Sequence, residues 1–387
     1  MLSFIQHHIY IILFYLILGV IILIFRKHFD VESGFILLWR TKLGINLMNK
    51  LSKKSRALVK LFGYSGIGFG FAGMLFVLYS LIKSAFTIFT KNNSTQSLSL
   101  VLPGTNIPGI GVLSFSYWII ILFVIAVVHE FSHGVVARAH KIRVKNSGLV
   151  LFGPIIGAFV EPSEKQLTKA DPVVQYSVFS AGPFSNILLA GLAILLMNLL
   201  FIPAFSSVSQ SSGVYFSSIE KNMPAYNASI KPNVVYTYVN NVSINNSDKF
   251  LQFMMRTRPN ETLVFKDINN KTYTLKTVEN PDNKALGFIG VVGINTKLTP
   301  KPGRKESFKV LNWIINLLKF LGVLSLGIGL FNLLPLGIVD GGRMLKAFLD
   351  DSFKDKKKST KIWAVVSTLT LALILFDLIM PLLVKLL

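Results

Sequence analysis

The chain has 387 residues, of which 52% are hydrophobic and only 15% are charged, whereas a soluble domain carries about 25% charged residues. The net charge of +22, from 40 basic and 18 acidic residues, does not indicate a nucleic-acid partner, because Lys and Arg cluster beside long apolar runs as they do in the loops of membrane proteins. The chain has no cysteine, which excludes disulfides, thiol nucleophiles and Cys-ligated metals, so any metal must be held by His, Asp or Glu.

Six apolar runs each approach the roughly 20 residues that a transmembrane helix requires. They comprise residues 8–25, 63–90, 115–137, 173–203, 310–335 and 362–386. We interpret the first run as a retained span and not as a signal peptide, because its positive charge follows the run instead of preceding it. The chain is therefore predicted to be an α-helical polytopic membrane protein with four spans in residues 1–203 and two in residues 310–387.

Basic residues assign a side of the membrane to the connecting segments. Segments 26–62, 138–172 and 336–361 are rich in Lys and Arg, which places them in the cytoplasm, whereas segment 91–114 carries only Lys91. This alternation is consistent with six transmembrane helices in the cell membrane. It predicts that both termini and residues 204–309 are extracytoplasmic.

Residues 204–309 differ in composition from the rest of the chain. Asn, Ser and Thr are frequent, and the runs "VVYTYV", "ETLVFKD" and "KTYTLKTV" predict strands, with a hairpin turn at "NNK". The run "SDKFLQFMMRTR" predicts a helix with Ser247 as its candidate N-cap. We therefore expect a small soluble α+β domain here.

Residues 147–162, "SGLVLFGPIIGAFVEP", are apolar but too short and too interrupted by glycine for a span. Their Val, Phe and Ile content favours a β-hairpin that dips into the membrane, where protein or water must satisfy its backbone. An interfacial loop packed under the helices is the alternative, and the residues alone favour neither.

The motif "HEFSH", His129 to His133, lies toward the inside end of the third apolar run. On a helix, histidines four residues apart share one face, where both imidazoles can bind one Zn²⁺ at about 2.0–2.1 Å. Glu130 can then act as the base that takes a proton from metal-bound water. Ionisable side chains inside a span are costly and indicate function, although hydrogen bonds from the two histidines to neighbouring helices are a structural alternative.

A catalytic zinc keeps three protein ligands and leaves a position for water. Asp340, in "FNLLPLGIVDGGRM", is the preferred third ligand because the fifth span reaches the inside face there. Asp171 precedes Pro172 and is typical of a helix N-cap, and Glu161 ends the apolar hairpin, where we expect it to be solvated. Taken alone, Asp340 is more simply a turn residue before two glycines; the unpartnered histidine pair favours the ligand interpretation.

These motifs resemble the site-2 protease family of intramembrane zinc metalloproteases, and the resemblance covers most of the chain. "HEFSH" and the later "NLLPLGIVDGG" match the family in order and side, with Asn332, Pro335 and Asp340 at the family's spacing. The glycine-broken hairpin and "SAGPFSN", which ends at Asn186, match as well. Val339 departs from the pattern, because Leu is more usual before the Asp.

The resemblance implies a metalloendopeptidase that cuts single-span membrane proteins within or beside the bilayer, as in regulated intramembrane proteolysis. It implies one Zn²⁺ per chain, held by His129, His133 and Asp340 toward the cytoplasmic side, with Glu130 as the base. It also implies a PDZ-like fold for residues 204–309. No glycine-rich carboxylate-binding loop is evident there, so peptide capture and a steric gatekeeping role both stay open.

Other polar and glycine-containing positions have candidate roles in handling the substrate. Asn186 and Asn332 could donate hydrogen bonds to the substrate backbone or to the developing oxyanion, or bond between spans instead. The hairpin Gly148–Val160 could pair with an unwound substrate strand. Gly182–Pro183 and Pro335 suggest bent helices that open a path for water.

Two other classes of function compete with a protease. A zinc transporter also places His and Asp inside spans, but it needs ligands along a path, and no other span carries such a set. A non-catalytic membrane scaffold acting through residues 204–309 gives no reason for Glu130 to stand between the histidines. The sequence does not indicate the substrate or the oligomeric state, and its lack of cysteine favours a prokaryotic source, archaeal more than bacterial.

Overall fold

The computed structural model describes residues 2–32, 36–91, 101–153 and 155–386. The chain divides into two compact units. Unit 1 comprises Met1–Met197 and Asn316–Leu387, and unit 2 comprises Asn198–Ile315.

Unit 1 contains the long apolar helices. Its elements are α1 (Leu2–Ile24), the 3₁₀ turn η1 (Arg26–His28), β1 (Phe29–Glu32), β2 (Ile36–Thr41), α2 (Ile45–Lys54), α3 (Arg56–Lys91), β3 (Asn106–Ile107), β4 (Gly111–Val112), α4 (Phe115–Ala139), β5 (Val144–Phe152), β6 (Ile155–Pro162), α5 (Glu164–Leu167), α6 (Pro172–Leu196), the end of α10 (Lys305–Asn332), α11 (Asp340–Ser352) and α12 (Lys356–Leu386).

Five helices among the described residues are long and apolar enough to cross a membrane, which confirms a polytopic membrane protein. They are Arg56–Thr90, Phe115–Ala139, Pro172–Val208, Lys305–Asn332 and Lys356–Pro381. Helix α1 contributes a shorter apolar stretch, Ile11–Ile24. The count of six transmembrane helices therefore stays a prediction.

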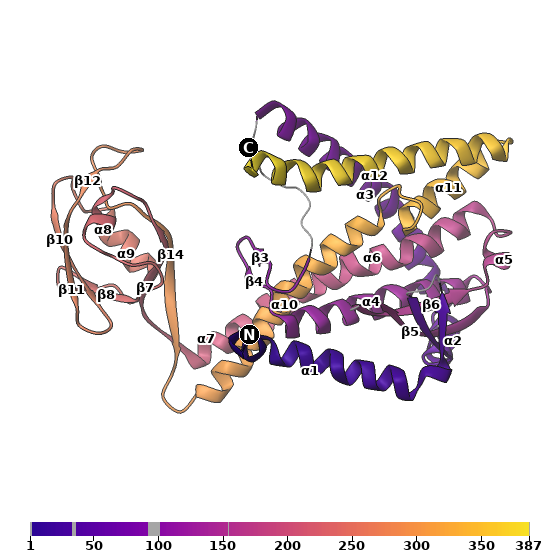
Figure 1. The fold of residues 1–387 in the computed structure, drawn as a ribbon, viewed down its shortest axis with the longest axis horizontal. Helices are drawn as coiled ribbons and strands as arrows, with labels where there is room; N and C mark the ends of the chain where they lie inside the picture. The colour runs from indigo at the N-terminus through magenta and orange to yellow at the C-terminus, as the bar shows by residue number, and fades with distance from the viewer. Residues whose placement is uncertain (1, 33–35, 92–100, 154, 387) are drawn as a thin grey trace. The chain divides into compact units, whose positions relative to one another are not determined.

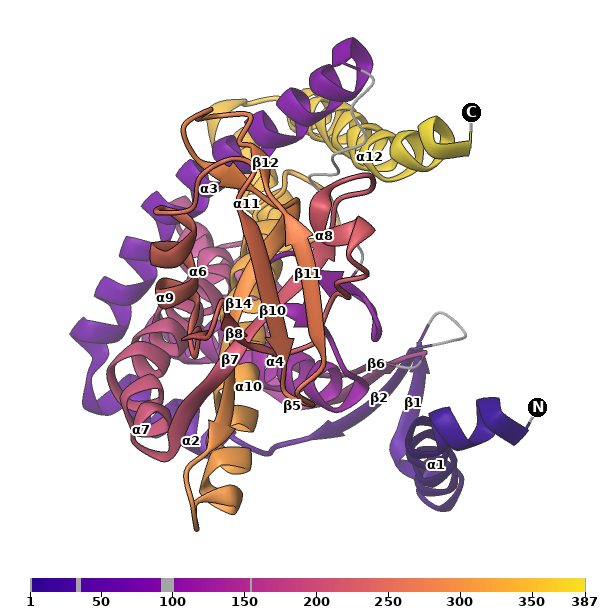
Figure 2. The same ribbon diagram turned by 90° about the vertical axis from the view of Figure 1, so that its left-hand side faces the viewer.

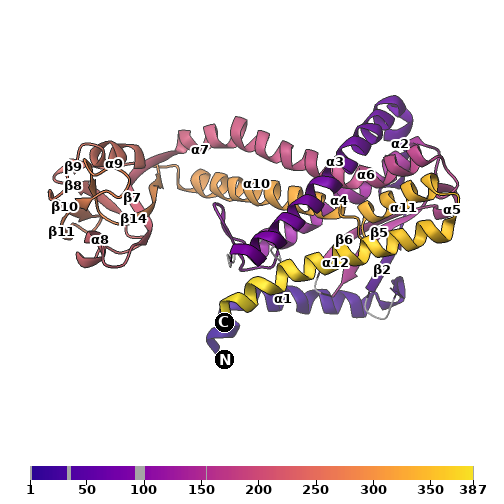
Figure 3. The same ribbon diagram turned by 90° about the horizontal axis from the view of Figure 1, so that it is seen from above.

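Small residues and buried aromatic side chains set the helix packing in unit 1. Figure 1 shows α4 and α6 side by side, next to the hairpin β5–β6, and Figure 3 shows α11 along α12. A Cβ atom at Gly63 of α3 would lie 2.2 Å from the Ser177 hydroxyl of α6, so glycine permits this close approach. Trp118 and Ile125 of α4 pack with Phe320 of α10.

A four-stranded antiparallel sheet, in the order β1-β2-β5-β6, lies beside α4. The hairpin predicted at Gly148–Val160 is present as β5 and β6. The sequence did not indicate β1 and β2, which lie in the segment predicted as a cytoplasmic loop. Arg40 of β2 contacts the carboxylates of Asp30 and Glu32, and β6 is left as the edge strand nearest α4.

Unit 2 is an antiparallel β-sheet with short helices (Figure 2), and it has its own apolar core. Its elements are the π-helical turn η2 (Met197–Phe201), α7 (Ile202–Val208), β7 (Ser209–Ile219), α8 (Pro224–Asn227), β8 (Tyr236–Val239), β9 (Val242–Ser243), α9 (Ser247–Met254), β10 (Thr262–Asp267), β11 (Thr272–Lys276), β12 (Val278–Glu279), β13 (Gly287–Phe288), β14 (Val291–Pro300) and the start of α10.

The strands of unit 2 run β11-β10-β8-β7-β14, with β9 beside β8. The predicted hairpin at "NNK" is present as β10 and β11. The predicted N-cap at Ser247 is wrong by one residue, because the side chain of Asn246 accepts the hydrogen bond from Lys249 N at 2.8 Å. Phe216, Tyr236, Phe250 and Phe265 form the centre of the core.

Candidate metal centre

Helix α4 places two imidazoles on one face, as the spacing of the motif predicts. His129 and His133 are both 8% exposed, their Nε2 atoms lie 3.2 Å apart, and their rings meet edge to face. Ligand atoms of His129, Glu130 and His133 all lie within 4.8 Å of one another, a grouping that could hold a metal ion. Glu130 is less buried than the histidines.

Asp340 comes from a distant part of the chain and meets the histidine pair. Its Oδ2 atom lies 3.0 Å from His129 Nε2 and 3.3 Å from His133 Nε2. The chain can turn this tightly because Gly341 and Gly342 follow: a Cβ atom there would lie 2.2 Å from Leu333 O and 2.0 Å from Leu336 O, respectively. Asp340 is therefore the first residue of α11 and not only a turn residue.

The three candidate ligand atoms fit a tetrahedral metal site. They form a triangle with sides of 3.0, 3.2 and 3.3 Å. Ligands held at about 2.0–2.1 Å in a tetrahedron stand about 3.3 Å apart, so one cation can contact all three. Two imidazoles and a carboxylate are a donor set that suits Zn²⁺, and three protein ligands leave a position open.

Helix α6 fixes the orientation of His133 through its backbone. The Nδ1–H group of His133 donates to the carbonyl of Val178 at 2.7 Å. This hydrogen bond places the ring proton on Nδ1 and leaves the Nε2 lone pair directed at the other two ligand atoms.

Asn186 of the same helix contacts the other imidazole. Its Nδ2 atom lies 3.0 Å from His129 Nδ1, and its Oδ1 atom is buried without a partner in the described part of the chain. The oxygen and nitrogen of an amide are distinguished only by their surroundings. With the amide turned over, Oδ1 accepts from His129 Nδ1–H, which satisfies the buried oxygen and frees Nε2 for a metal.

Gly182 of α6 lies directly against both imidazoles. A Cβ atom at this position would stand 2.3 Å from His133 Nε2 and 2.6 Å from His129 Nε2. The imidazoles lie directly beside Gly182, and the expectation that Gly182–Pro183 opens a path for water stays a prediction. Helix α6 continues through Pro183 without interruption.

Glu130 stands between two cavities of different character. Its Oε2 atom accepts a hydrogen bond from the backbone N–H of Val160 on β6 at 3.0 Å. One cavity, of about 370 Å³, reaches Glu130, His133 and Asp340 and is rimmed by charged side chains such as Arg343. The other, of about 660 Å³, reaches Glu130 between α4, β2, β5 and β6 and is mostly apolar.

The remaining candidates lie in different surroundings. Asp171 is the N-cap residue of α6, as predicted. Glu161 accepts a hydrogen bond from Asn146 at 2.9 Å and pairs with Lys145, and these contacts hold the pKa of Glu161 below its usual value. Asn332 donates to Ile328 O within its own helix at 3.0 Å, so its role toward a substrate stays a prediction.

Sequence reasoning did not identify the contacts that α6 and β6 make with the centre. The Val178 carbonyl accepts from His133, and the Val160 N–H group donates to Glu130. Gly182, which has no side chain, lies against both imidazoles. The two backbone groups leave no signal in the sequence. Gly182 could have been inferred from the small residues of "SAGPFSN", which permit close helix contact.

Comparisons with known proteins give a family and a relative. The family model described as "Peptidase family M50" matches residues 117–376. An uncharacterised protein of the archaeon Methanocaldococcus jannaschii is 28% identical over 348 residues, which cover 88% of this chain and 86% of that protein. Among solved structures, the PDZ domain of an SdrC-like protein of Listeria monocytogenes aligns with 21% of this chain and 87% of its own at 16% identity, with a TM-score of 0.20.

Proposed function

Because the chain belongs to peptidase family M50, the site-2 protease family of membrane metalloproteases, we propose that it is an intramembrane zinc endopeptidase that cuts single-span membrane proteins. The observation that carries this proposal is the convergence of His129, His133 and Asp340 into one triangle of ligand atoms, with Glu130 beside it. We further propose that this site lies toward the cytoplasmic side, as the basic loops predict.

Each residue of the centre has a separate chemical role in this proposal. His129, His133 and Asp340 hold Zn²⁺, which when bound supplies a Lewis acid that makes water nucleophilic near neutral pH. The carboxylate of Glu130 takes a proton from the attacking water and returns it to the leaving amide nitrogen. The Val160 N–H group holds this carboxylate in place through its hydrogen bond.

The edge of β6 is suited to hold an unwound substrate. In an antiparallel ladder, the N–H and C=O groups of alternate residues point toward the partner strand and away from it. The N–H group of Val160 bonds to Glu130 and therefore points away from β5. The N–H group of Ala158, two residues earlier, points away from β5 as well. A substrate strand paired with β6 would therefore run toward Glu130.

The two cavities suit the two reactants. The apolar cavity, lined by residues such as Phe123, Val127 and Phe159, suits the side chains of a transmembrane segment. The charged rim of the other cavity suits water, which must reach the centre for hydrolysis. Glu130 borders both cavities, which is the position that a general base requires.

We also propose that residues 204–309 form a PDZ-like extracytoplasmic domain that limits which substrates reach the membrane domain. The support is the resemblance in sequence, together with a five-stranded antiparallel path and two short helices around a separate core. Peptide capture and steric exclusion are both compatible with this role.

The decisive experiment compares Glu130→Gln with the intact protein in phospholipid vesicles. We expect cleavage of a panel of single-span membrane proteins to fall by at least about 10²-fold, because the proton acceptor is lost, while one zinc per chain is retained. Glu164→Gln is the matched control, since Glu164 lines the same charged cavity but lies on α5. Cleavage that survives Glu130→Gln, or that persists with a chelator, would contradict the assignment.

Zinc transport is the alternative that the same vesicles can exclude. Uptake of zinc into sealed vesicles that depends on His129 would favour a transporter. Metal content that stays at one zinc per chain and is lost in Asp340→Asn, without uptake, favours the protease.

A further inference from the structure

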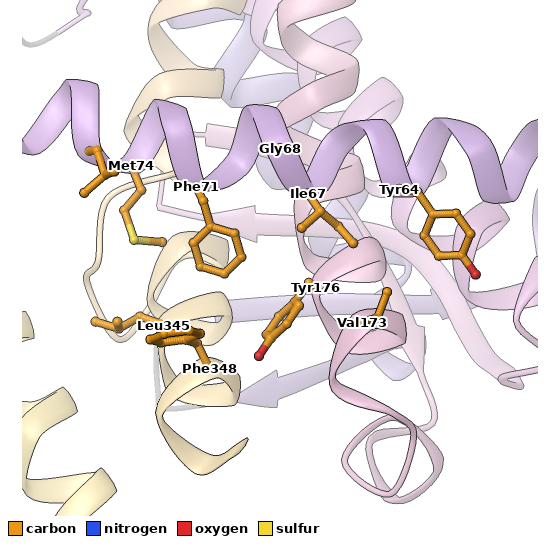
Figure 4. Close-up of a pocket in the computed structure, with 10 residues that line it drawn as sticks. Tyr64, Ile67, Gly68, Phe71, Met74, Val173, Tyr176, Leu345 and Phe348 are labelled. Carbon is orange, nitrogen blue, oxygen red and sulfur yellow. The ribbon is translucent and has the colours of Figure 1, made fainter. Parts of the chain in front are cut away.

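A third cavity, of about 640 Å³, opens in unit 1 between α3, α6 and α11, and its lining includes none of the candidate metal ligands. Figure 4 shows side chains from all three helices pointing into the same gap. They are apolar or aromatic and include Tyr64, Phe71, Met74, Val173, Tyr176 and Phe348.

The cavity is a groove along one face of α3. Tyr64, Gly68, Phe71 and Leu75 line it at spacings of three and four residues, which places them on one side of the helix. A Cβ atom at Gly68 would meet nothing within 4 Å, so the middle of the groove is open. From Tyr64 to Leu75 the helix rises about 16 Å, close to the depth of one leaflet of a hydrocarbon core about 30 Å thick.

The same face of α3 carries two cations beyond the end of the groove. Arg56 and Lys60 precede Tyr64 by eight and four residues, and in the described part of the chain neither has a carboxylate within 4.0 Å. The Tyr64 ring, which lines the groove, also meets the ring of His140 at 5.6 Å. Arg56 Nε donates to the backbone carbonyl of Ala139, next to His140, at 2.8 Å. Burial, together with the charges of Lys60 and Arg56, lowers the pKa of His140 to about 4.

We propose that this face of α3 binds one anionic phospholipid, with its phosphate on Arg56 and Lys60 and an acyl chain in the groove. Two adjacent cations without a carboxylate partner attract a phosphate, and basic pockets between membrane helices are suited to acidic lipid headgroups. An uncharged lipid would fill the groove but would leave the positive charges of Arg56 and Lys60 without an anionic partner.

Other occupants fit less well. A transmembrane helix of ordinary apolar composition would fill the groove but would bring no negative charge to Arg56 and Lys60. A second copy of the chain, with a net charge of +22, would bring more positive charge to a cluster that already lacks anions.

The test uses the whole protein in phosphatidylcholine vesicles with a trace of photoactivatable phosphatidylglycerol or phosphatidylcholine, each carrying a diazirine in one acyl chain. Cross-linking is measured on the peptides that contain Phe71 and Phe348. We expect a several-fold higher yield with phosphatidylglycerol than with phosphatidylcholine. Lys60→Gln should lower the phosphatidylglycerol yield about fivefold, the effect of one cation near a lipid surface, whereas Lys50→Gln, in the same basic segment, should leave it unchanged.

A second pair of variants tests the groove itself. Gly68→Trp should fill it and reduce cross-linking of both lipids, whereas Gly191→Trp, whose Cβ also meets open space but on α6 outside the groove, should not. Equal yields from the two lipids, or equal effects of the two tryptophans, would overturn the proposal. A change of oligomeric state in Gly68→Trp would also overturn it, because it would assign the groove to a second copy of the chain. A loss of substrate cleavage with lipid labelling unchanged would overturn it as well, because it would assign the groove to the substrate.

Discussion

In the proposed function, metal binding by His129 requires the ring proton on Nδ1, and Asn186 is the side chain that contacts Nδ1. Removing its amide leaves Nδ1 without a partner in a buried site and lets the proton move to Nε2. We expect Asn186→Ala to weaken zinc affinity about 10- to 100-fold, measured by competition with a fluorescent chelator. Asn332→Ala is the control, since Asn332 bonds within its own helix; equal losses in the two variants would refute the positioning role.

Gly182 provides a second prediction at the scale of one residue. A methyl group there would lie within 2.6 Å of both imidazoles, so Gly182→Ala should displace them and abolish zinc binding. Gly191→Ala, on the same helix with open space around its Cβ, should keep one zinc per chain and gain up to about 1 kcal/mol in helix stability. Zinc content and thermal unfolding measure the two effects. A fully zinc-loaded Gly182→Ala variant would mean that the contact is not needed.

The residues of the centre were predictable from the sequence to different degrees. His129 and His133 follow from a spacing within one helix, and Asp340 follows from the need for a third ligand on the same side of the membrane. The supporting contacts from Val178 and Gly182 depend on how α6 rotates and packs against α4. That rotation is set by side-chain packing between spans, which hydrophobic patterns do not specify.

Strand β6 can be tested as the element that receives the substrate. Ala158→Pro removes an N–H group that points away from β5, so the β5–β6 ladder should survive, as proline is tolerated at sheet edges. We expect zinc content to stay at one per chain while cleavage of membrane substrates falls several-fold, because one hydrogen bond to the substrate strand is lost. Phe159→Pro removes an N–H group that points toward β5 and should destabilise the hairpin itself. Unchanged cleavage by Ala158→Pro would exclude strand pairing at this edge.

Elements with a strong local signal were predicted, and those defined by distant pairing were not. The long apolar helices and the hairpin β5–β6 follow from composition and from glycine interruptions. Strands β1 and β2 were not predicted from the sequence. Strand β2 pairs with β5, more than a hundred residues away, as in Thr41 opposite Ser147. Short strands beside basic residues resemble loops until their partner is known.

At the scale of the whole molecule, the number of membrane crossings depends on whether α1 spans the bilayer. Five helices have the required length and apolarity, whereas α1 offers a shorter apolar stretch. The basic segments before α3 and after α10 predict a cytoplasmic location for both, whichever side α1 begins on. Six spans place the N-terminus outside the cell, and five place it inside.

The absence of cysteine makes this topology directly measurable, because each introduced thiol is the only one in the chain. A membrane-impermeant maleimide should label Lys284→Cys, in unit 2, in intact cells, because alternation places residues 204–309 outside. Lys50→Cys and Lys357→Cys should react only after permeabilisation, since both lie among clustered basic residues. A cysteine added ahead of Met1 separates the two counts: labelling in intact cells supports six spans, and labelling only after permeabilisation supports five. Labelling of Lys50→Cys in intact cells would show that the topology is the inverse of the predicted one, with the metal centre toward the outer face.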